Sequence, residues 1–157
     1  MRFFLLNILV ALLWMLMWGE FDLYLLFGGF VVGYLLLGLV SRTTGATNYG
    51  VRVWKLLSFL AYFIKILVIA NLQVAWEIVT PKFNMTPRII RYDVTGMTAV
   101  QVTTLANSIT LTPGTLSADV SDDGKSLFIH CMYARDREQA VRGLDELRDR
   151  IMQEVFA

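Results

Sequence analysis

Apolar residues dominate the first forty positions of the chain and form two uninterrupted runs. Residues 3–18 and 23–40 contain no Asp, Glu, Lys, Arg or His, and a short polar segment, residues 19–22, separates them. At a helical rise of 1.5 Å per residue the runs reach about 24 and 27 Å, close to the roughly 30 Å hydrocarbon core of a bilayer. The pattern predicts two transmembrane helices, over about residues 3–18 and 23–40, in a hairpin that occupies residues 1–50.

An apolar run behind Arg2 is also how a secretory signal peptide begins, and this is the alternative for residues 3–18. The segment Trp18-Gly19-Glu20 is a poor cleavage site because it lacks the small-x-small pattern. A second apolar run also follows at once. We therefore expect the first run to be retained as a membrane helix.

The second run carries a pair of glycines, Gly29 and Gly33, on one helical face. In lipid, a small-xxx-small face lets another helix approach closely, and association there depends on packing. The plainer explanation is that glycine is more frequent in membrane helices than in soluble ones. Because the chain is too short to form a bundle by itself, we expect Gly29 and Gly33 to pack against helices of other subunits.

Charges around the two runs bear on transport and on orientation. Ion and proton paths through membranes are marked by charged or titratable residues inside the spans, and both runs lack them, so we expect this chain not to conduct ions itself. The loop between the runs is acidic, whereas Arg2 and residues 41–55 are basic. The positive-inside rule then places the N-terminus and residues 41–55 in the cytoplasm.

Residues 51–80 allow two interpretations. The part from 53 to 70 is long and apolar enough for a third span. The polar residues, however, fall within about a third of the helical turn, as in a helix that lies in the interface plane. They are Lys55, Ser58, Tyr62, Lys65, Gln73 and Glu77. We favour a long amphipathic helix at the cytoplasmic surface or in a groove of a larger assembly, ended by Thr80-Pro81, and leave the third span open.

Residues 81–157 predict a small α+β domain of order β-α-β-β-α. A strand over residues 88–94 precedes a helix that Thr98 and Gln101 begin as a capping box and that Thr112-Pro113-Gly114 ends. A hairpin follows, in which Leu116, Ala118 and Val120 alternate with polar residues before the turn Ser121–Gly124 and a return strand over residues 126–132. The last helix runs from about Arg137 to Phe156, with Asp136 as its N-cap.

Composition supports this division into a membrane part and a soluble-looking part. Hydrophobic residues make up 56% and charged residues 17% of the 157 residues, against about 45–50% and 25% in ordinary soluble domains. Of the 27 charged residues, 19 lie in residues 81–157, and yet none lies between Val94 and Ala118. This uncharged stretch is either a docking face toward other subunits or the membrane, or a Thr-rich helix buried in a small core.

The sequence gives no basis for an enzyme, a cofactor or a metal site. One cysteine, Cys131, and one histidine, His130, cannot form a zinc site, and no nucleophile pairs with the histidine. The aspartates near residue 120 lack the spacing of a calcium loop and are typical of a turn. A net charge of +1 gives no basic face for nucleic acid.

Several segments together resemble one family over essentially the whole chain. They are Trp54-Lys55-Leu56, residues 70–74 (ANLQV), Thr80-Pro81-Lys82, residues 109–116 (ITLTPGTL), and Ser121-Asp122-Asp123-Gly124 leading into residues 127–130 (LFIH). The chain is similar to the E subunit of the Mrp-type (Mrp/Mnh/Pha) multisubunit Na⁺/H⁺ antiporters. The block at residues 109–116 is the most specific part of the resemblance.

The resemblance implies a multi-pass subunit of a bacterial or archaeal plasma membrane. The positive-inside rule, with residues 51–80 at the membrane surface, places the N-terminus and the C-terminal domain in the cytoplasm. Its partners would be two large subunits similar to those of respiratory complex I, small membrane subunits and the lipid bilayer. The assembly would exchange Na⁺, or K⁺, for protons in pH homeostasis, and this subunit would support assembly and activity. Thr112, Pro113, Gly114 and Thr115 match the family, with a structural or subunit-packing role. The alternative is a membrane-anchored regulatory module whose α+β domain binds a ligand.

Overall fold

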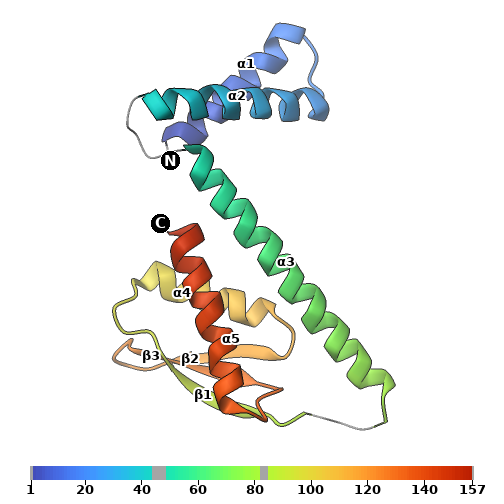
Figure 1. Cartoon of the computed structure of the whole chain (residues 1–157), viewed down its shortest axis with the longest axis vertical. Coiled ribbons are helices and arrows are strands. Elements are labelled where there is room, and N and C mark those ends of the chain that lie inside the picture. The colour runs from blue at the N-terminus through green and yellow to red at the C-terminus, as the bar shows by residue number, and fades with distance from the viewer. Residues whose placement is uncertain (1, 44–48, 82–84, 157) are drawn as a thin grey trace. The chain divides into compact units, whose positions relative to one another are not determined.

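The structure is a computed structural model that describes residues 2–43, 49–81 and 85–156. Its contacts divide the chain into two units, residues 1–57 and 58–157. Both units can be followed in Figure 1, in which the colour runs along the chain from the N-terminus to the C-terminus. Each unit is described by itself.

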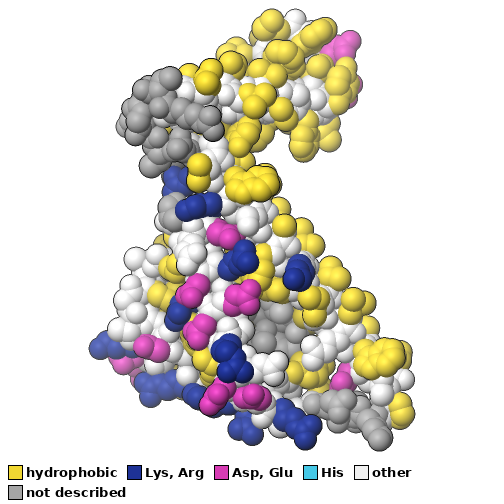
Figure 2. All heavy atoms as spheres, viewed as in Figure 1, with side chains coloured by type: hydrophobic (Ala, Val, Ile, Leu, Met, Phe, Trp, Pro, Cys, Tyr) yellow, Lys and Arg dark blue, Asp and Glu magenta, His cyan; other side chains and the backbone are white. Residues whose placement is uncertain are grey.

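The first unit is a helical hairpin followed by the beginning of a third helix. Helix α1 (Arg2–Trp18) packs against helix α2 (Leu23–Thr43), and helix α3 (Tyr49–Val79) begins in this unit (Figure 1). Helices α2 and α3 are long and apolar enough to cross a membrane, and α1 is a shorter apolar helix. Large apolar side chains of the hairpin are exposed on its outer surface, which suits a lipid or protein environment rather than water (Figure 2).

The second unit contains the rest of α3 and the predicted α+β domain. The elements after α3 are strand β1 (Arg88–Asp93), helix α4 (Ala99–Leu111), strands β2 (Thr115–Val120) and β3 (Ser126–Cys131), and helix α5 (Arg137–Arg150) with a π-helical turn η1 (Ile151–Val155). This confirms the predicted fold class, apolar N-terminal helices followed by a small α+β domain.

The three strands form an antiparallel sheet of order β1-β3-β2. Ile90 lies opposite Ile129 in the first pair, and Leu116 lies opposite His130 in the second. The register of the second pair shifts between Ser117 and Asp119, which is a bulge in β2. The central strand is therefore the return strand of the predicted hairpin.

The helix caps and the hairpin turn that the sequence predicts are present in the structure. The Thr98 side chain accepts a hydrogen bond from the Gln101 backbone N–H (3.4 Å), and the Gln101 side chain accepts one from the Thr98 N–H (2.8 Å). Asp136 Oδ1 accepts from the Glu138 N–H (2.9 Å), which caps α5. Gly124 has a φ of +67°, as a left-handed position in the hairpin turn requires.

The last helix differs from the prediction of one continuous helix to Phe156. The α-helical part ends at Arg150, and the final turn is π-helical, with the Phe156 N–H donating to the Ile151 carbonyl at 3.2 Å. Side-chain periodicity does not separate i→i−4 from i→i−5 bonding over a single turn. Ile151, fully buried, belongs to the core in spite of this change.

The core of the second unit lies between the sheet and the helices. Strand β1 alternates exposed residues with buried Ile90 and Tyr92, which shows that one of its faces is covered. The buried side chains come from β1, β3, α4, the last helix and the segments beside them, and are Ile90, Tyr92, Val94, Leu105, Ile109, Leu127, Ile129, Cys131, Ala134, Leu144, Leu147 and Ile151. Phe59, Tyr62, Phe63 and Ile66 of α3 pack against this core from outside.

Unfolding of the second unit is expected to become easier above pH 10 because of Tyr92. Its hydroxyl donates to Asp145 Oδ1 at 2.7 Å, and burial, followed by this hydrogen bond, holds the pKa of Tyr92 well above its ordinary value of 10.0. The folded state thus keeps a proton that the unfolded chain releases, so the free energy of unfolding falls as pH rises through 10. Denaturation followed at pH 8 and pH 11 should show a smaller fall for Tyr92→Phe, and equal falls in the two proteins would contradict this assignment.

Candidate functional site

The glycine face of α2 is occupied by α1 of the same chain. A Cβ atom at Gly29 would lie 2.8 Å from both Ala11 Cα and Trp14 Cβ, and one at Gly33 would overlap Asn7 Oδ1. At Gly29 the clash is with the Ala11 backbone, so this position requires glycine for the helices to approach as they do, whereas at Gly33 the space is taken by the buried Asn7 side chain, which would have to shift. The two predicted packing glycines therefore close the hairpin itself.

A buried amide and two tyrosines join the hairpin to the beginning of α3. Asn7, fully buried, donates from Nδ2 to the Tyr49 hydroxyl at 2.9 Å. The Tyr34 hydroxyl donates to the Gly50 carbonyl at 3.3 Å. The apolar pattern did not predict these contacts, although Asn7 is the only amide in the first apolar run and so was the available signal. A polar group buried among apolar helices requires a partner; Tyr49 is the partner of the Asn7 NH₂ group, whereas Asn7 Oδ1 accepts no hydrogen bond from the residues that the structure describes.

Within the second unit, α3 has two different faces. Its inner face packs on the α+β core and includes Tyr62, over whose ring the Arg150 guanidinium lies at 4.5 Å. Arg150 also pairs with Glu154 at 3.0 Å. The outer face is mostly apolar, with Lys65 as its charged residue, and its apolar side chains are about half exposed or more at Leu60, Ile64, Val68, Ile69, Leu72 and Trp76. Much of the predicted polar stripe thus lies on the domain side, with Tyr62 half-buried and Glu77 buried, while Lys65 is exposed.

The predicted block Thr112–Thr115 joins α4 to the sheet. The Thr115 hydroxyl lies 2.7 Å from the Ile109 carbonyl and 2.9 Å from the Thr112 carbonyl, so it closes the helix end. The Gly114 carbonyl accepts from the Met132 N–H at 2.8 Å, which fixes the block beside β3. These contacts involve Thr112, Gly114 and Thr115 in the fold of the domain.

The same block lines a cavity of about 340 Å³ inside the second unit. Residues of α3 and α5, among them Ile66 and Leu147, complete the lining together with Tyr133. The Tyr133 hydroxyl is buried and makes no hydrogen bond to the residues that the structure describes. A mostly apolar cavity of this volume that also presents a few polar groups has the form of a small-molecule site.

Replacing Gly114 by alanine is expected to destabilise the domain by about 1–3 kcal/mol, the usual cost of a strained backbone position. Gly114 has a φ of +87°, and an added Cβ would lie 3.0 Å from Tyr133 Cε2. Gly143→Ala in α5 is the matched control, because nothing lies within 4 Å of a Cβ there and alanine favours the helix. Chemical denaturation of the two variants should separate them, and equal stability would contradict a structural role for the block.

The remaining candidate residues serve structure rather than chemistry. Asp123 Oδ1 accepts from the Ser121 hydroxyl at 2.6 Å and from the Lys125 N–H at 3.0 Å, and these hydrogen bonds lower the pKa of Asp123. Burial raises the pKa of the Cys131 thiol, which keeps it protonated and unreactive. Among the described residues, no group of three or more His, Cys, Asp or Glu side chains could hold a metal ion.

Comparison with known proteins identifies the class to which this arrangement belongs. A family model described as "Na+/H+ ion antiporter subunit" matches residues 7–155. The chain is 34% identical over 154 residues to the E subunit of the Na(+)/H(+) antiporter of Bacillus subtilis (strain 168), and 32% identical over 151 residues to the E subunit of the Alkalihalophilus pseudofirmus antiporter. Each match covers 96% of this chain and 96% of the relative.

A chain in the solved structure of the Mrp complex from Dietzia sp. DQ12-45-1b is also similar. It has a TM-score of 0.50 and 26% identity, and the match covers 60% of this chain and 90% of that chain. The class is therefore a subunit of a membrane transporter rather than an enzyme. The chain belongs to the E-subunit family of the Mrp-type multisubunit Na⁺/H⁺ antiporters, as the resemblance of its sequence motifs predicts.

Proposed function

We propose that this chain is an accessory subunit that supports assembly and activity of the antiporter without conducting ions. The observation that supports this proposal is that the two apolar runs, residues 3–18 and 23–40, contain no charged residue or histidine. Asn7, which is buried inside the hairpin, cannot take up or release a proton and is hydrogen-bonded to Tyr49. Ion and proton paths through a membrane are marked by Asp, Glu, Lys, Arg or His inside the spans, and these runs contain none of them.

The partners of this chain are the other subunits of the complex, including large subunits similar to those of complex I. The docking face that we assign to them is the outer face of α4, which exposes Val100 and Leu111 and lies in the stretch between Val94 and Ala118 that contains no charged residue. Interface cores are depleted in charged residues, which fits this surface. Gly29 and Gly33 support docking indirectly, since they set the shape of the hairpin.

Helix α3 is proposed to lie along the cytoplasmic membrane surface rather than to cross the bilayer. Residues 59–66 pack on the α+β domain through one face. The nine residues 49–57 that precede this unit span only about 14 Å at 1.5 Å per residue, less than half of the hydrocarbon core. The outer apolar face of α3 then contacts lipid, the inner face carries the domain, and both the N-terminus and the domain lie in the cytoplasm.

Cysteine labelling tests this topology, because the single native cysteine is buried and can be replaced. In a Cys131→Ala background, Glu20→Cys, Lys65→Cys and Gln153→Cys are labelled with an impermeant maleimide in intact cells and in inverted vesicles. We expect Glu20→Cys to react from outside and the other two from the cytoplasmic side. Reaction of Gln153→Cys from outside would show that α3 crosses the membrane.

Transport measurements test the accessory role. The complex with and without this chain, and the purified chain alone, are placed in liposomes that hold a sodium or a pH gradient. We expect antiport from the full complex, little from the complex without the chain, and none from the chain alone. A gradient dissipated by the chain alone would refute the proposal.

The cavity of about 340 Å³ is the observation that favours the second candidate function, a ligand-binding regulatory module. Its test is Ala70→Phe, which adds volume at a residue that lines the cavity. A regulatory site predicts antiport that no longer responds to a small molecule, whereas an accessory role predicts unchanged antiport once the complex is assembled.

A further inference from the structure

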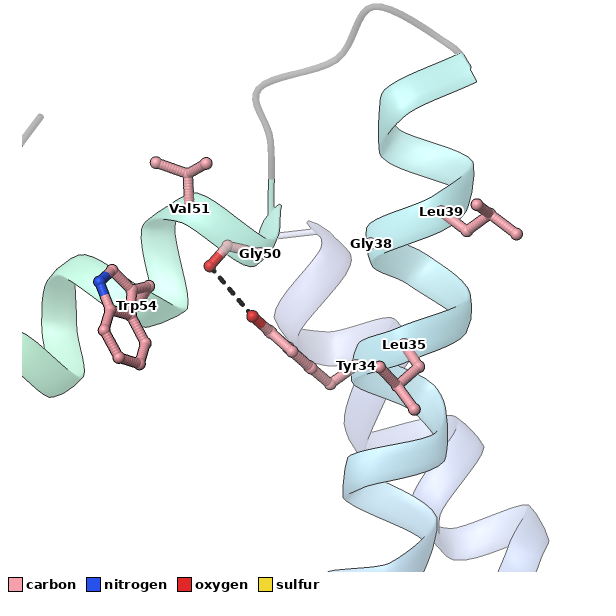
Figure 3. A pocket seen from close by; sticks show the side chains of 7 residues that line it. All are labelled: Tyr34, Leu35, Gly38, Leu39, Gly50, Val51 and Trp54. Atoms are coloured by element: carbon pink, nitrogen blue, oxygen red, sulfur yellow. Dashed lines mark hydrogen bonds between the residues drawn. The ribbon is translucent and has the colours of Figure 1, made fainter.

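A groove of about 480 Å³ lies between the end of α2 and the beginning of α3, within the first unit (Figure 3). Its lining is Tyr34, Leu35, Gly38, Leu39, Gly50, Val51 and Trp54. The hydrogen bond from the Tyr34 hydroxyl to the Gly50 carbonyl joins the two helices beside the groove, as the dashed line in Figure 3 shows. Among the residues that the structure describes, none lies within 4 Å of a Cβ built at Gly38.

The walls of the groove are apolar and exposed. Leu35, Leu39 and Trp54 expose 64%, 65% and 70% of their surfaces. Both helices that form the groove are long and apolar enough to cross or lie on a membrane. An apolar chain fits such a groove, and a tryptophan at its edge suits the headgroup level of a bilayer.

The charged residues closest in sequence to the groove lining, Arg42, Arg52 and Lys55, are all basic. Between Leu23 and Trp76 the sequence contains no Asp or Glu, and its charged residues are Arg42, Arg52, Lys55 and Lys65. Lys55 follows Val51 of the groove by one helical turn, so both side chains leave the same side of α3. Arg52 is exposed. A ligand with an apolar tail and a negatively charged head group would match both the apolar walls of the groove and the basic residues.

We propose that this groove binds an acyl chain of an anionic phospholipid, with the phosphate near Arg52 and Lys55. Basic pockets beside membrane helices recognise anionic headgroups in this way. The inference rests on the membrane placement in the proposed function. It goes further, because it assigns a lipid site to the junction that connects the hairpin to α3.

Photocrosslinking tests the site in the assembled antiporter complex. The complex is reconstituted in nanodiscs that contain phosphatidylglycerol or phosphatidylcholine with a diazirine on the acyl chain, and crosslinked peptides are identified by mass spectrometry. We expect phosphatidylglycerol to label residues 35–39 and 50–54 more strongly than phosphatidylcholine. Removal of each basic side chain by Arg52→Gln or Lys55→Gln should lower the labelling by phosphatidylglycerol about fivefold.

Two matched pairs of variants separate the lipid site from other effects. Gly38→Leu fills the groove and should remove the labelling, whereas Gly38→Ala leaves room and should keep it. Lys65→Gln, on the same helix as Lys55 but further along, should leave the labelling unchanged. Equal labelling by the two lipids, or crosslinks to another subunit in place of lipid, would overturn the proposal. Co-purification of every variant with the other subunits is measured in parallel, so that loss of lipid is distinguished from loss of assembly.

Discussion

Replacing Gly29 by leucine is expected to open the α1–α2 hairpin and to remove this subunit from the antiporter complex. A Cβ at Gly29 would lie 2.8 Å from Ala11 Cα and 3.0 Å from the Ala11 carbonyl oxygen. These are backbone atoms, which cannot turn away as a flexible side chain does, so the two helices must separate. Overpacking of a tight contact costs about 1–3 kcal/mol, and a leucine against backbone is expected at the upper end of that range.

Gly38→Leu is the control for this prediction. It makes the same change on the same helix, but nothing lies within 4 Å of a Cβ at Gly38. We expect the Gly38→Leu variant to co-purify with the complex at the native yield and the Gly29→Leu variant to be lost from it. The yields from mild detergent extracts are the measurement. Native recovery of the Gly29→Leu variant would show that the close approach of the helices is not required.

Leu105→Ala is expected to unfold a large fraction of the α+β domain and to lower antiport by the complex. Leu105 lies in α4, is fully buried and belongs to the core beside Ile109 and Ile129. Loss of a buried leucine side chain costs about 2–5 kcal/mol, a large part of the stability of a domain of this size. The hairpin, a separate unit, should stay in the membrane.

Hydrogen exchange of the purified complex is the measurement for Leu105→Ala. Peptides of β1, β3 and α4 should lose protection, while peptides of α1 and α2 should keep it. Leu105→Met is the control, because it nearly conserves volume and usually costs less than about 1.5 kcal/mol. If Leu105→Ala keeps both native protection and native antiport, the domain does not depend on this core and the prediction is wrong.

The helix ends and turns of the α+β domain are predicted well because their signals are local. Thr98 and Gln101 form the capping box, Asp136 caps α5, and Gly124 takes the left-handed position of the hairpin turn. Each of these interactions joins residues a few positions apart, so the sequence contains the whole interaction. The final turn of the last helix is the exception, since a π-helical turn changes one hydrogen bond without changing the apolar pattern.

The candidate site is predicted only in part. The glycine pair Gly29 and Gly33 is a close-packing face, but the helix it meets in this chain is α1, through Ala11 and Asn7. A pattern of small residues predicts which face of a helix packs closely, but not which helix packs against that face. A contribution of Gly29 and Gly33 to packing against other subunits stays a proposal. These residues would act through the shape of the hairpin rather than by direct contact.

Sequence alone determined that this chain has two apolar, charge-free runs in its N-terminal part, a charged α+β part and the motifs of its antiporter family. These follow from residue type and short-range periodicity, which do not require knowledge of distant contacts. Tertiary structure alone decided which faces are covered. In β2 the alternation predicts the strand, yet Leu116, which lies opposite His130, is exposed and points away from the core, while the Ser117 hydroxyl donates to the Ala106 carbonyl of α4 at 3.0 Å. Periodicity defines two faces of an element, and only long-range packing selects the one that is buried.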